Sequence, residues 1–191
     1  HAIGIDDVLA VGGYLADQLE RPGLRVVRNE QFETTNMVSS LFCAREWFDD
    51  GFIISYGDIA YAPSVLRKLL ADDAPTSVVV DDDWLAYWRE RFDDPLSDAE
   101  SLRLNADGCI TDIGGAVSDV DEIEAQYMGL MRFRKGGIDA LTAARDNWKS
   151  TTRPWMDKRP VRQAYMTDLL MEMILMGRAV HAVPVDGGGL E

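Results

Sequence analysis

Residues 52–58 have the sequence FIISYGD, a short apolar run that ends in glycine and aspartate. A run of this length, rich in β-branched and aromatic residues and followed by a turn signal, predicts a buried strand. Similar runs alternate with helical patterns along the first half of the chain, an order typical of a parallel sheet with helices on both faces. We expect strands at 7–11, 24–27, 52–56 and 77–80, and helices at 14–20, 37–48 and 63–70.

The second half of the chain has a different pattern. Two short strands, 101–105 and 109–113, flank an Asp-Gly turn, which predicts a β-hairpin. We also expect a helix at 84–91, a long strand at 124–133, a helix at 164–176 and a strand at 181–185. The fold class is therefore α/β, a Rossmann-like and mostly parallel sheet flanked by helices with a small antiparallel insertion, in a single domain over 1–191.

Composition excludes several function classes. The formal net charge of −14 argues against nucleic-acid binding, which needs clustered Lys and Arg. No segment is apolar for long enough to span a bilayer, and no signal-peptide pattern begins the chain. Cys43 and Cys109 form neither a zinc pattern nor a disulfide framework, so we expect a soluble, cytoplasmic protein. Hydrolase and zinc-enzyme motifs are absent, and His181 has the context of a structural histidine.

Carboxylates follow two of the expected strands, where ligands bind in parallel sheets. Asp58 comes directly after a buried strand and a glycine, and its hard carboxylate suits Mg²⁺; the alternative is a turn or capping aspartate. Asp81, Asp82 and Asp83 follow the next strand. One of them, Asp83 by position, is expected to cap the helix that begins at Trp84. A carboxylate beside Trp84 could instead receive an ammonium group, although aromatic residues at this spacing are more often core.

Short polar side chains gather between the second strand and the helix that begins near residue 37. Such a junction suits a nucleotide base, sugar or phosphate, and ordinary helix capping explains only one or two of these residues. They are Thr34, Thr35, Asn36, Ser39 and Ser40.

The roles of two other segments are undecided from the sequence. Residues 145–160 form either a lid or, by preference, a polar surface crossover. Leu130, Met131 and Phe133 belong to either the core or a homodimer face.

Taken in order, seven segments resemble the phosphocholine and phosphonate cytidylyltransferase group of the sugar-phosphate nucleotidyltransferase superfamily. The resemblance covers nearly the whole chain and rests on order and spacing rather than on one motif. The segments are VGGY (11–14), Asn29 with TNMVSSL (35–41), YGDI (56–59), VDDDW (80–84), RFDDPL (91–96) with DAE (98–100), EAQYMGL (124–130) and YMTDLL (165–170).

The resemblance implies a GT-A-like nucleotidyltransferase fold and a Mg²⁺-dependent reaction with CTP. An oxygen of a small phosphonate or phosphate-monoester acceptor would attack the α-phosphorus of CTP and release pyrophosphate. Asp58 then matches the family's catalytic and metal-binding aspartate. The implied nucleotide-binding residues are Gly13, Thr35, Asn36, Ser39, Ser40 and Gly57, and the implied acceptor-binding residues are Asp83, Trp84, Glu124, Tyr127 and Asp168.

The chain departs from the family pattern at both ends. Its first residues follow the point where the family has a first strand and a Gly-rich, basic loop, and its last residues, 185–191, stop where the family has a second metal-binding aspartate. We therefore expect the middle of such an enzyme, and poor catalysis by these 191 residues alone. The alternatives are a sugar-1-phosphate nucleotidyltransferase that uses another NTP and a non-catalytic regulatory domain of the same fold.

Overall fold

A four-stranded sheet forms the centre of the molecule in the computed structural model, which describes residues 3–150, 160–186 and 189–190. Its strand order is β3 (Gly51–Ser55), β8 (Gln126–Arg134), β5 (Thr76–Asp81) and β9 (His181–Val185). β8 runs antiparallel to both neighbours, and β5 runs parallel to β9. Because β3, β5 and β9 share one direction, the prediction of a mostly parallel α/β sheet is confirmed.

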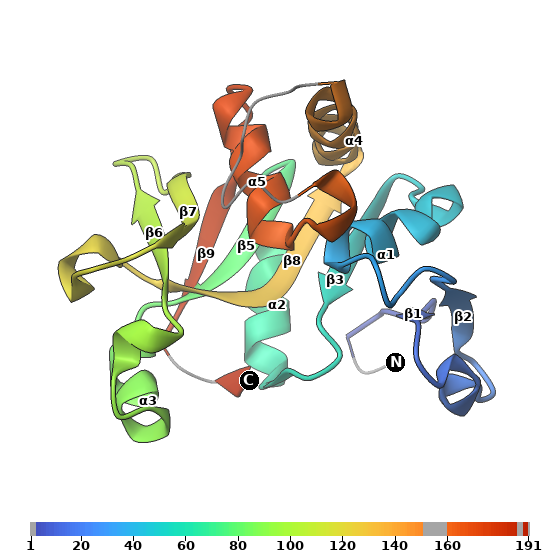
Figure 1. The fold of residues 1–191 in the computed structure, drawn as a ribbon, viewed down its shortest axis with the longest axis horizontal. Coiled ribbons are helices and arrows are strands. Elements are labelled where there is room, and N and C mark those ends of the chain that lie inside the picture. The colour runs from blue at the N-terminus through green and yellow to red at the C-terminus, as the bar shows by residue number, and fades with distance from the viewer. Residues whose placement is uncertain (1–2, 151–159, 187–188, 191) are drawn as a thin grey trace.

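A separate parallel pair, β1 (Leu9–Gly12) and β2 (Arg25–Arg28), lies beside the β3 end of the molecule (Figure 1). Among the described residues, β1 pairs only with β2, and β3 pairs only with β8. α1 (Met37–Cys43) connects the two parts, because it contacts both strands of the pair and also α5 (Met166–Leu175).

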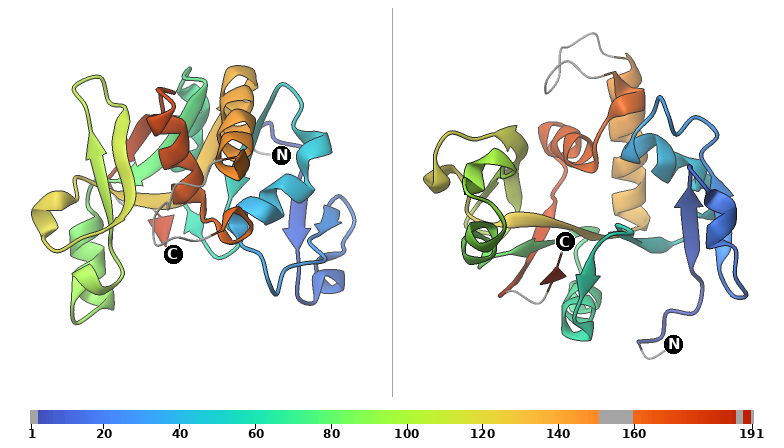
Figure 2. Two further views of the ribbon diagram at one scale, coloured as in Figure 1. Left: turned by 45° about the horizontal axis from the view of Figure 1, so that its top comes forward. Right: turned by 60° about the horizontal axis from the view of Figure 1, so that its bottom comes forward.

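Helices cover both faces of the central sheet. Figure 2 (right) shows α1, α5 and α4 (Lys135–Ser150) on one face and α2 (Pro63–Ala71) on the other. β5 is buried along its whole length because alternate residues face each layer: Val78 and Val80 pack toward α4 and α5, whereas Val79 packs with Leu69 of α2. α2 begins at Pro63, whose fixed φ suits the first turn of a helix.

The antiparallel insertion is confirmed as a hairpin of β6 (Glu100–Leu104) and β7 (Ile110–Ala116), preceded by α3 (Trp84–Arg91). α3 packs its two tryptophans, Trp84 and Trp88, against Ile123 in a small core of its own. Several short elements complete the chain. They are the 3₁₀ helices η1 (Ala16–Leu19), η2 (Arg45–Trp47), η3 (Pro95–Ser97), η4 (Val120–Glu122) and η6 (Val161–Gln163), and the strands β4 (Ala60–Tyr61) and β10 (Gly189–Leu190).

The structure corrects three expectations about local structure. The helix expected at 14–20 is the short 3₁₀ helix η1, and the helix expected at 37–48 ends at Cys43, with η2 after it. The polar connection expected at 145–160 is wrong for residues 145–150, which complete the unpredicted helix α4. The rest of that segment, on which the choice between lid and crossover depends, lies outside the described residues up to residue 159.

The open question about β8 is settled by burial. Leu130, Met131 and Phe133 are fully buried and pack in the two main cores, so they supply no homodimer face. Within the described residues, no helix is both long enough and apolar enough to cross a membrane.

His181, the first residue of β9, forms an ion pair with Asp72, which lies before the start of β5. Its Nδ1 atom lies 2.7 Å from Asp72 Oδ2, and the other oxygen of that carboxylate accepts hydrogen bonds from the Ser77 hydroxyl at 2.6 Å and the Ala74 N–H at 3.0 Å. Burial raises the pKa of Asp72, but these hydrogen bonds and the charge of His181 outweigh it, so the pKa is lowered overall. The folded protein therefore holds the charged form of Asp72 more tightly than the unfolded chain does.

We predict that Asp72 makes stability fall in acid. A depressed folded-state pKa contributes stability that is present above the unfolded pKa of about 3.9 and is lost as the pH falls through the folded value. Urea unfolding of wild type and Asp72→Asn between pH 7 and pH 3 measures this. The free energies of unfolding should differ most at pH 7 and converge toward pH 3. A difference that stays constant across this range would contradict the assignment.

Candidate active site

Aspartates follow each of the three co-directional strands at its carboxyl end. Asp58 follows β3, Asp81 ends β5 and Asp186 follows β9. Asp81 is paired both with Val185 at the end of β9 and with Gln126 at the start of β8. Because these strands share one direction, their carboxyl ends lie at one edge of the sheet, where α/β proteins bind ligands.

Asp58 lies in the turn between β3 and β4 and is exposed to solvent. β10 runs antiparallel to β4, with Leu190 opposite Ala60, so the end of the chain passes two residues from Asp58. The described residues give the Asp58 carboxylate no hydrogen bond or ion pair, and no three His, Cys, Asp or Glu side chains among them converge on a metal site. Mg²⁺ commonly takes only one or two protein carboxylates and completes its shell with water and phosphate oxygens, so a single exposed carboxylate fits it.

The carboxylates after β5 and β9 repel one another. Burial raises the pKa of Asp82, and the charges of Asp186 and Asp81 raise it further, whereas Lys68 on α2 lowers it. The Lys68 ammonium donates a 2.7 Å hydrogen bond to the Pro184 carbonyl, which fixes this cation beside the end of β9. The edge therefore carries a negative field that a cationic group would relieve.

Two tyrosines pack together beside this edge. Tyr56, two residues before Asp58, packs edge-to-face with Tyr127, and their hydroxyl oxygens are 3.1 Å apart. β8 departs from regular pairing with β5 between Val78 and Val80, and Gly129 there has a φ of +71°. A Cβ atom at residue 129 would lie 2.7 Å from the ring of Tyr56, so this ring packs directly on the glycine. Neither Tyr56 nor Gly129 was singled out from the sequence, although a glycine inside a strand is a usual signal of a bulge.

The residues expected on the acceptor side have different environments. Tyr127 is half-buried at the sheet edge. Trp84 is only 3% exposed and belongs to the α3 core, as the core interpretation of the aromatic residues anticipated. Asp83 takes the N-cap position of α3 without a capping hydrogen bond from its side chain; instead Asp81 Oδ1 accepts the Asp83 N–H at 3.0 Å.

The remaining two acceptor candidates support the backbone. Glu124 accepts the Leu104 N–H at 2.7 Å and so links the residues just before β8 to the hairpin. Asp168 is 1% exposed and accepts the Tyr165 N–H at 2.8 Å, which closes a capping box at the start of α5. Binding roles for these side chains stay predictions.

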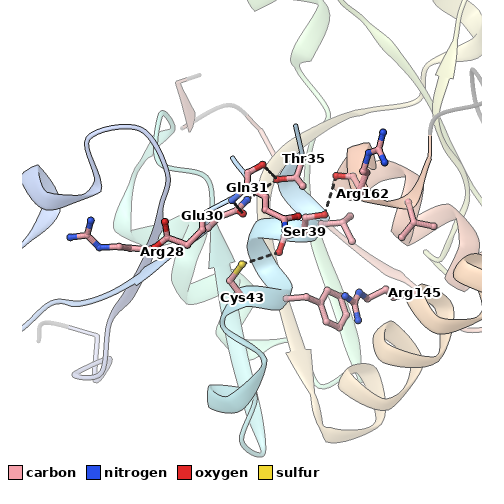
Figure 3. A pocket seen from close by; sticks show the side chains of 12 residues that line it. Arg28, Glu30, Gln31, Thr35, Ser39, Cys43, Arg145 and Arg162 are labelled. Atoms are coloured by element: carbon pink, nitrogen blue, oxygen red, sulfur yellow. Dashed lines mark hydrogen bonds between the residues drawn. The ribbon is translucent and has the colours of Figure 1, made fainter. Parts of the chain in front are cut away.

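A cavity of about 590 Å³ opens at the polar junction between β2 and α1 (Figure 3). Two of the residues expected to bind nucleotide, Thr35 and Ser39, line it. The Ser39 hydroxyl donates to the Arg162 carbonyl at 2.9 Å, which joins α1 to η6. The other lining residues are Arg28, Asn29, Glu30, Gln31, Val38, Phe42, Cys43, Arg145, Val161 and Arg162.

Asn29 organises this junction, a role that the sequence did not assign. Its buried side-chain amide donates to the Thr35 hydroxyl at 2.8 Å and to the Ser40 hydroxyl at 3.0 Å, and accepts the Gln31 N–H at 3.0 Å. Its backbone N–H donates to the Gly12 carbonyl at the end of β1. Asn29 thus ties the end of β1 to the start of α1.

The other expected nucleotide-binding residues have clear local roles. Asn36 caps α1, because its side chain accepts the Met37 N–H at 2.8 Å. Gly13 lies under Phe32, where any Cβ atom would clash. Gly57 lies apart from the cavity, in the exposed turn with Asp58.

Arg145 of α4 is one of the cations that line the cavity. The Arg145 guanidinium lies over the Phe42 ring, 4.1 Å from its centre, and burial lowers its pKa while Asp146 raises it (Figure 3). Burial raises the pKa of the neighbouring Cys43 thiol, against the charge of Arg145, so Cys43 stays protonated at neutral pH.

No family model matches the chain, but two curated proteins and a solved structure resemble it. The chain is 32% identical to a CTP:phosphoglutamine cytidylyltransferase of Campylobacter jejuni subsp. jejuni serotype O:2, over 98% of this chain and 78% of that protein. It is 29% identical to a CMP-5'-(3-aminopropyl)phosphonate synthase of Streptomyces rubellomurinus, over 58% of this chain and 17% of that protein. The inositol-1-phosphate CTP transferase of T. maritima shares its fold, with a TM-score of 0.68 and 17% identity over 96% of this chain and 68% of that one.

The match to the Campylobacter protein spans nearly the whole chain and most of that enzyme. It includes both the sheet edge around Asp58 and the junction around Asn29. The chain therefore belongs to the cytidylyltransferase group of the nucleotidyltransferase superfamily.

Proposed function

We propose that the protein transfers CMP from CTP to a small phosphonate or phosphocholine-like acceptor in a Mg²⁺-dependent reaction. An acceptor oxygen forms a bond to the α-phosphorus of CTP. The bond from that phosphorus to the oxygen bridging to the β-phosphorus breaks, and its electron pair leaves with pyrophosphate. The protein's task is to position the two substrates and to compensate charge, and no covalent intermediate is required.

The observation that carries the proposal is the match over 98% of the chain to an enzyme named for CTP and a phosphorylated small molecule. The cavity at the β2–α1 junction supports it, because it offers hydroxyls and an arginine to a nucleotide. The names of both curated relatives combine cytidine chemistry with a phosphorus-containing compound that also carries nitrogen.

The charges of the sheet edge support an acceptor that carries a positive group. Asp82, Asp83 and Asp186 are all exposed there, and Lys68 is the cation that acts on Asp82. An ammonium or trimethylammonium group would be attracted to this edge, whereas a sugar 1-phosphate brings only negative charge. The half-buried Tyr56–Tyr127 pair offers aromatic surface beside it.

Asp58 is the residue that would hold Mg²⁺. Bound there, the ion would neutralise phosphate charge and help to orient the triphosphate. The exposed position of Asp58 at the end of β3 leaves its carboxylate open to such an ion.

Pyrophosphate release tests the proposal. CTP, ATP, GTP and UTP are each combined with phosphocholine, 2-aminoethylphosphonate, 3-aminopropylphosphonate, phosphoglutamine and a sugar 1-phosphate, with Mg²⁺ and with EDTA. We expect release with CTP and an amine-bearing acceptor, and none with EDTA. Release that favours another NTP with the sugar 1-phosphate would overturn both the nucleotide and the acceptor assignment. Calorimetry with CTP on the same sample shows whether a silent panel reflects a missing acceptor or absent nucleotide binding.

A further inference from the structure

The Asn29 amide has only one orientation that fits its partners. A backbone N–H can only donate, so the atom 3.0 Å from the Gln31 nitrogen must be the amide oxygen. The amide nitrogen then donates its two hydrogens to the hydroxyl oxygens of Thr35 and Ser40, at 2.8 and 3.0 Å. Asn29 is 5% exposed, so these bonds are shielded from water.

This orientation also fixes the proton of the Thr35 hydroxyl. Thr35 Oγ1 receives a hydrogen from Asn29, so its own proton must point to an acceptor, and the Gln31 carbonyl lies 2.8 Å away. Both the proton and one lone pair of Thr35 are therefore engaged within the protein. The remaining lone pair makes this hydroxyl an acceptor, and not a donor, toward anything in the cavity that Thr35 lines.

An acceptor of fixed direction can distinguish pyrimidine bases. Cytosine carries an exocyclic amino group, which donates, at the position where uracil carries a carbonyl oxygen, which accepts. A carbonyl placed against Thr35 Oγ1 would face a lone pair and would leave a hydrogen bond unmade. Sites built to hydrogen-bond one group reject analogues that lack it far better than apolar pockets do.

We propose that Thr35 is a specificity-determining residue that accepts a hydrogen bond from the cytosine amino group, and that Asn29 is the positioning residue that enforces this direction. The inference rests on the proposed use of CTP and adds the atom that selects CTP over UTP. Ser39 also lines the cavity and gives its proton to the Arg162 carbonyl at 2.9 Å, so it too presents only an acceptor there. Of the two hydroxyls that line the cavity, only that of Thr35 has its direction set by Asn29.

The test measures the dissociation constants of CTP and UTP by calorimetry on the full chain, and the ratio of kcat/KM for the two nucleotides. Wild type should prefer CTP by about 10- to 100-fold, in the range by which directional contacts discriminate between bases. Thr35→Val removes the acceptor at nearly constant shape and should bring the ratio close to one. Thr35→Ser restores a hydroxyl and should recover most of the preference.

Thr34→Val is the matched control, because the neighbouring Thr34 hydroxyl donates to the same Gln31 carbonyl, at 3.3 Å, but does not line the cavity. It should leave the ratio unchanged. Asn29→Ala removes the donor, so that the Thr35 hydroxyl can turn its proton toward the cavity, and should also lower the ratio. The Asn29→Ala/Thr35→Val double variant should lower it no further than Thr35→Val alone. This second route keeps the test valid if Thr35→Val does not fold.

The outcomes separate the inference from the function on which it rests. Wild type that binds neither nucleotide would contradict the proposed function itself. Wild type that binds CTP and UTP equally, or a Thr35→Val variant that keeps the wild-type preference, would overturn the role of Thr35 while leaving nucleotide binding in place. An unchanged ratio in Asn29→Ala would overturn the positioning role of Asn29.

Discussion

Asp58→Asn should lower the rate of CMP transfer by about 10²- to 10³-fold, the size of effect seen when one electrostatic group at a reacting centre is removed. Asparagine keeps the shape of the side chain and removes its charge, so the loss measures what the carboxylate contributes at the end of β3. Asp58 is exposed and has no hydrogen bond or ion pair among the described residues. The melting temperature of the Asp58→Asn variant should therefore match that of wild type. Pyrophosphate release with CTP and the best acceptor measures the rate.

Asp107→Asn is the control for charge, since Asp107 is an exposed aspartate in the hairpin turn, away from the sheet edge. It removes the same charge and should leave the rate within about twofold of wild type. The Mg²⁺ concentration for half-maximal rate should rise in Asp58→Asn if the carboxylate holds the ion. Full activity at wild-type Mg²⁺ concentrations in Asp58→Asn would exclude Asp58 as both metal ligand and catalytic residue.

The sequence predicted most of the strands because each is a short apolar run that ends in a turn signal. FIISYGD at 52–58 became β3 and the Asp58 turn, and the run at 77–80 became the buried centre of β5. It could not predict that β8 inserts antiparallel between them, because strand order depends on tertiary packing rather than on local pattern. The fully buried side chains of Leu130, Met131 and Phe133 show how completely that strand enters the core.

α4 was missed for a physical reason. It begins with Lys135-Gly136-Gly137, and two glycines disfavour a helix. The structure needs a glycine at residue 137, where any Cβ atom would lie 2.1 Å from the Pro75 carbonyl oxygen. The close packing of α4 against the residue before β5 therefore requires a glycine, even though glycine has a low helix propensity.

The candidate site was predictable in its residue types and not in its connections. Hydroxyls before a helix indicated the nucleotide junction, and Thr35 and Ser39 do line a cavity there. The part played by Asn29 could not be read from the sequence, because its bonds to Thr35 and Ser40 span 6 and 11 residues and require β2 to end beside α1. For Trp84, the sequence left two interpretations, a core residue or a binding residue. The structure places its side chain in a core with Ile123.

Gly129→Ala should be the most damaging small substitution at the sheet edge. An alanine held at the φ of +71° that residue 129 has would lose about 1–2 kcal/mol of stability. Its Cβ atom would lie 2.7 Å from the Tyr56 ring, and this overpacking would cost about 1–3 kcal/mol more. Gly177→Ala is a matched control, since Gly177 has a φ of +73° and no atom within 4 Å of the added Cβ. Urea unfolding should therefore show a loss of about 2–5 kcal/mol for Gly129→Ala and only about 1–2 kcal/mol for Gly177→Ala.

The difference between the two alanine variants reports mainly on the contact with Tyr56, because the two glycines have nearly the same positive φ. If the contact also positions the Tyr56–Tyr127 pair for the acceptor, KM for the acceptor should rise in Gly129→Ala at a temperature where the variant is folded, while KM for CTP stays near the wild-type value. Gly177→Ala should change neither. Equal losses of stability in the two variants would show that the ring moves away without cost, and the Tyr56 contact would then have no role in holding this edge of the sheet.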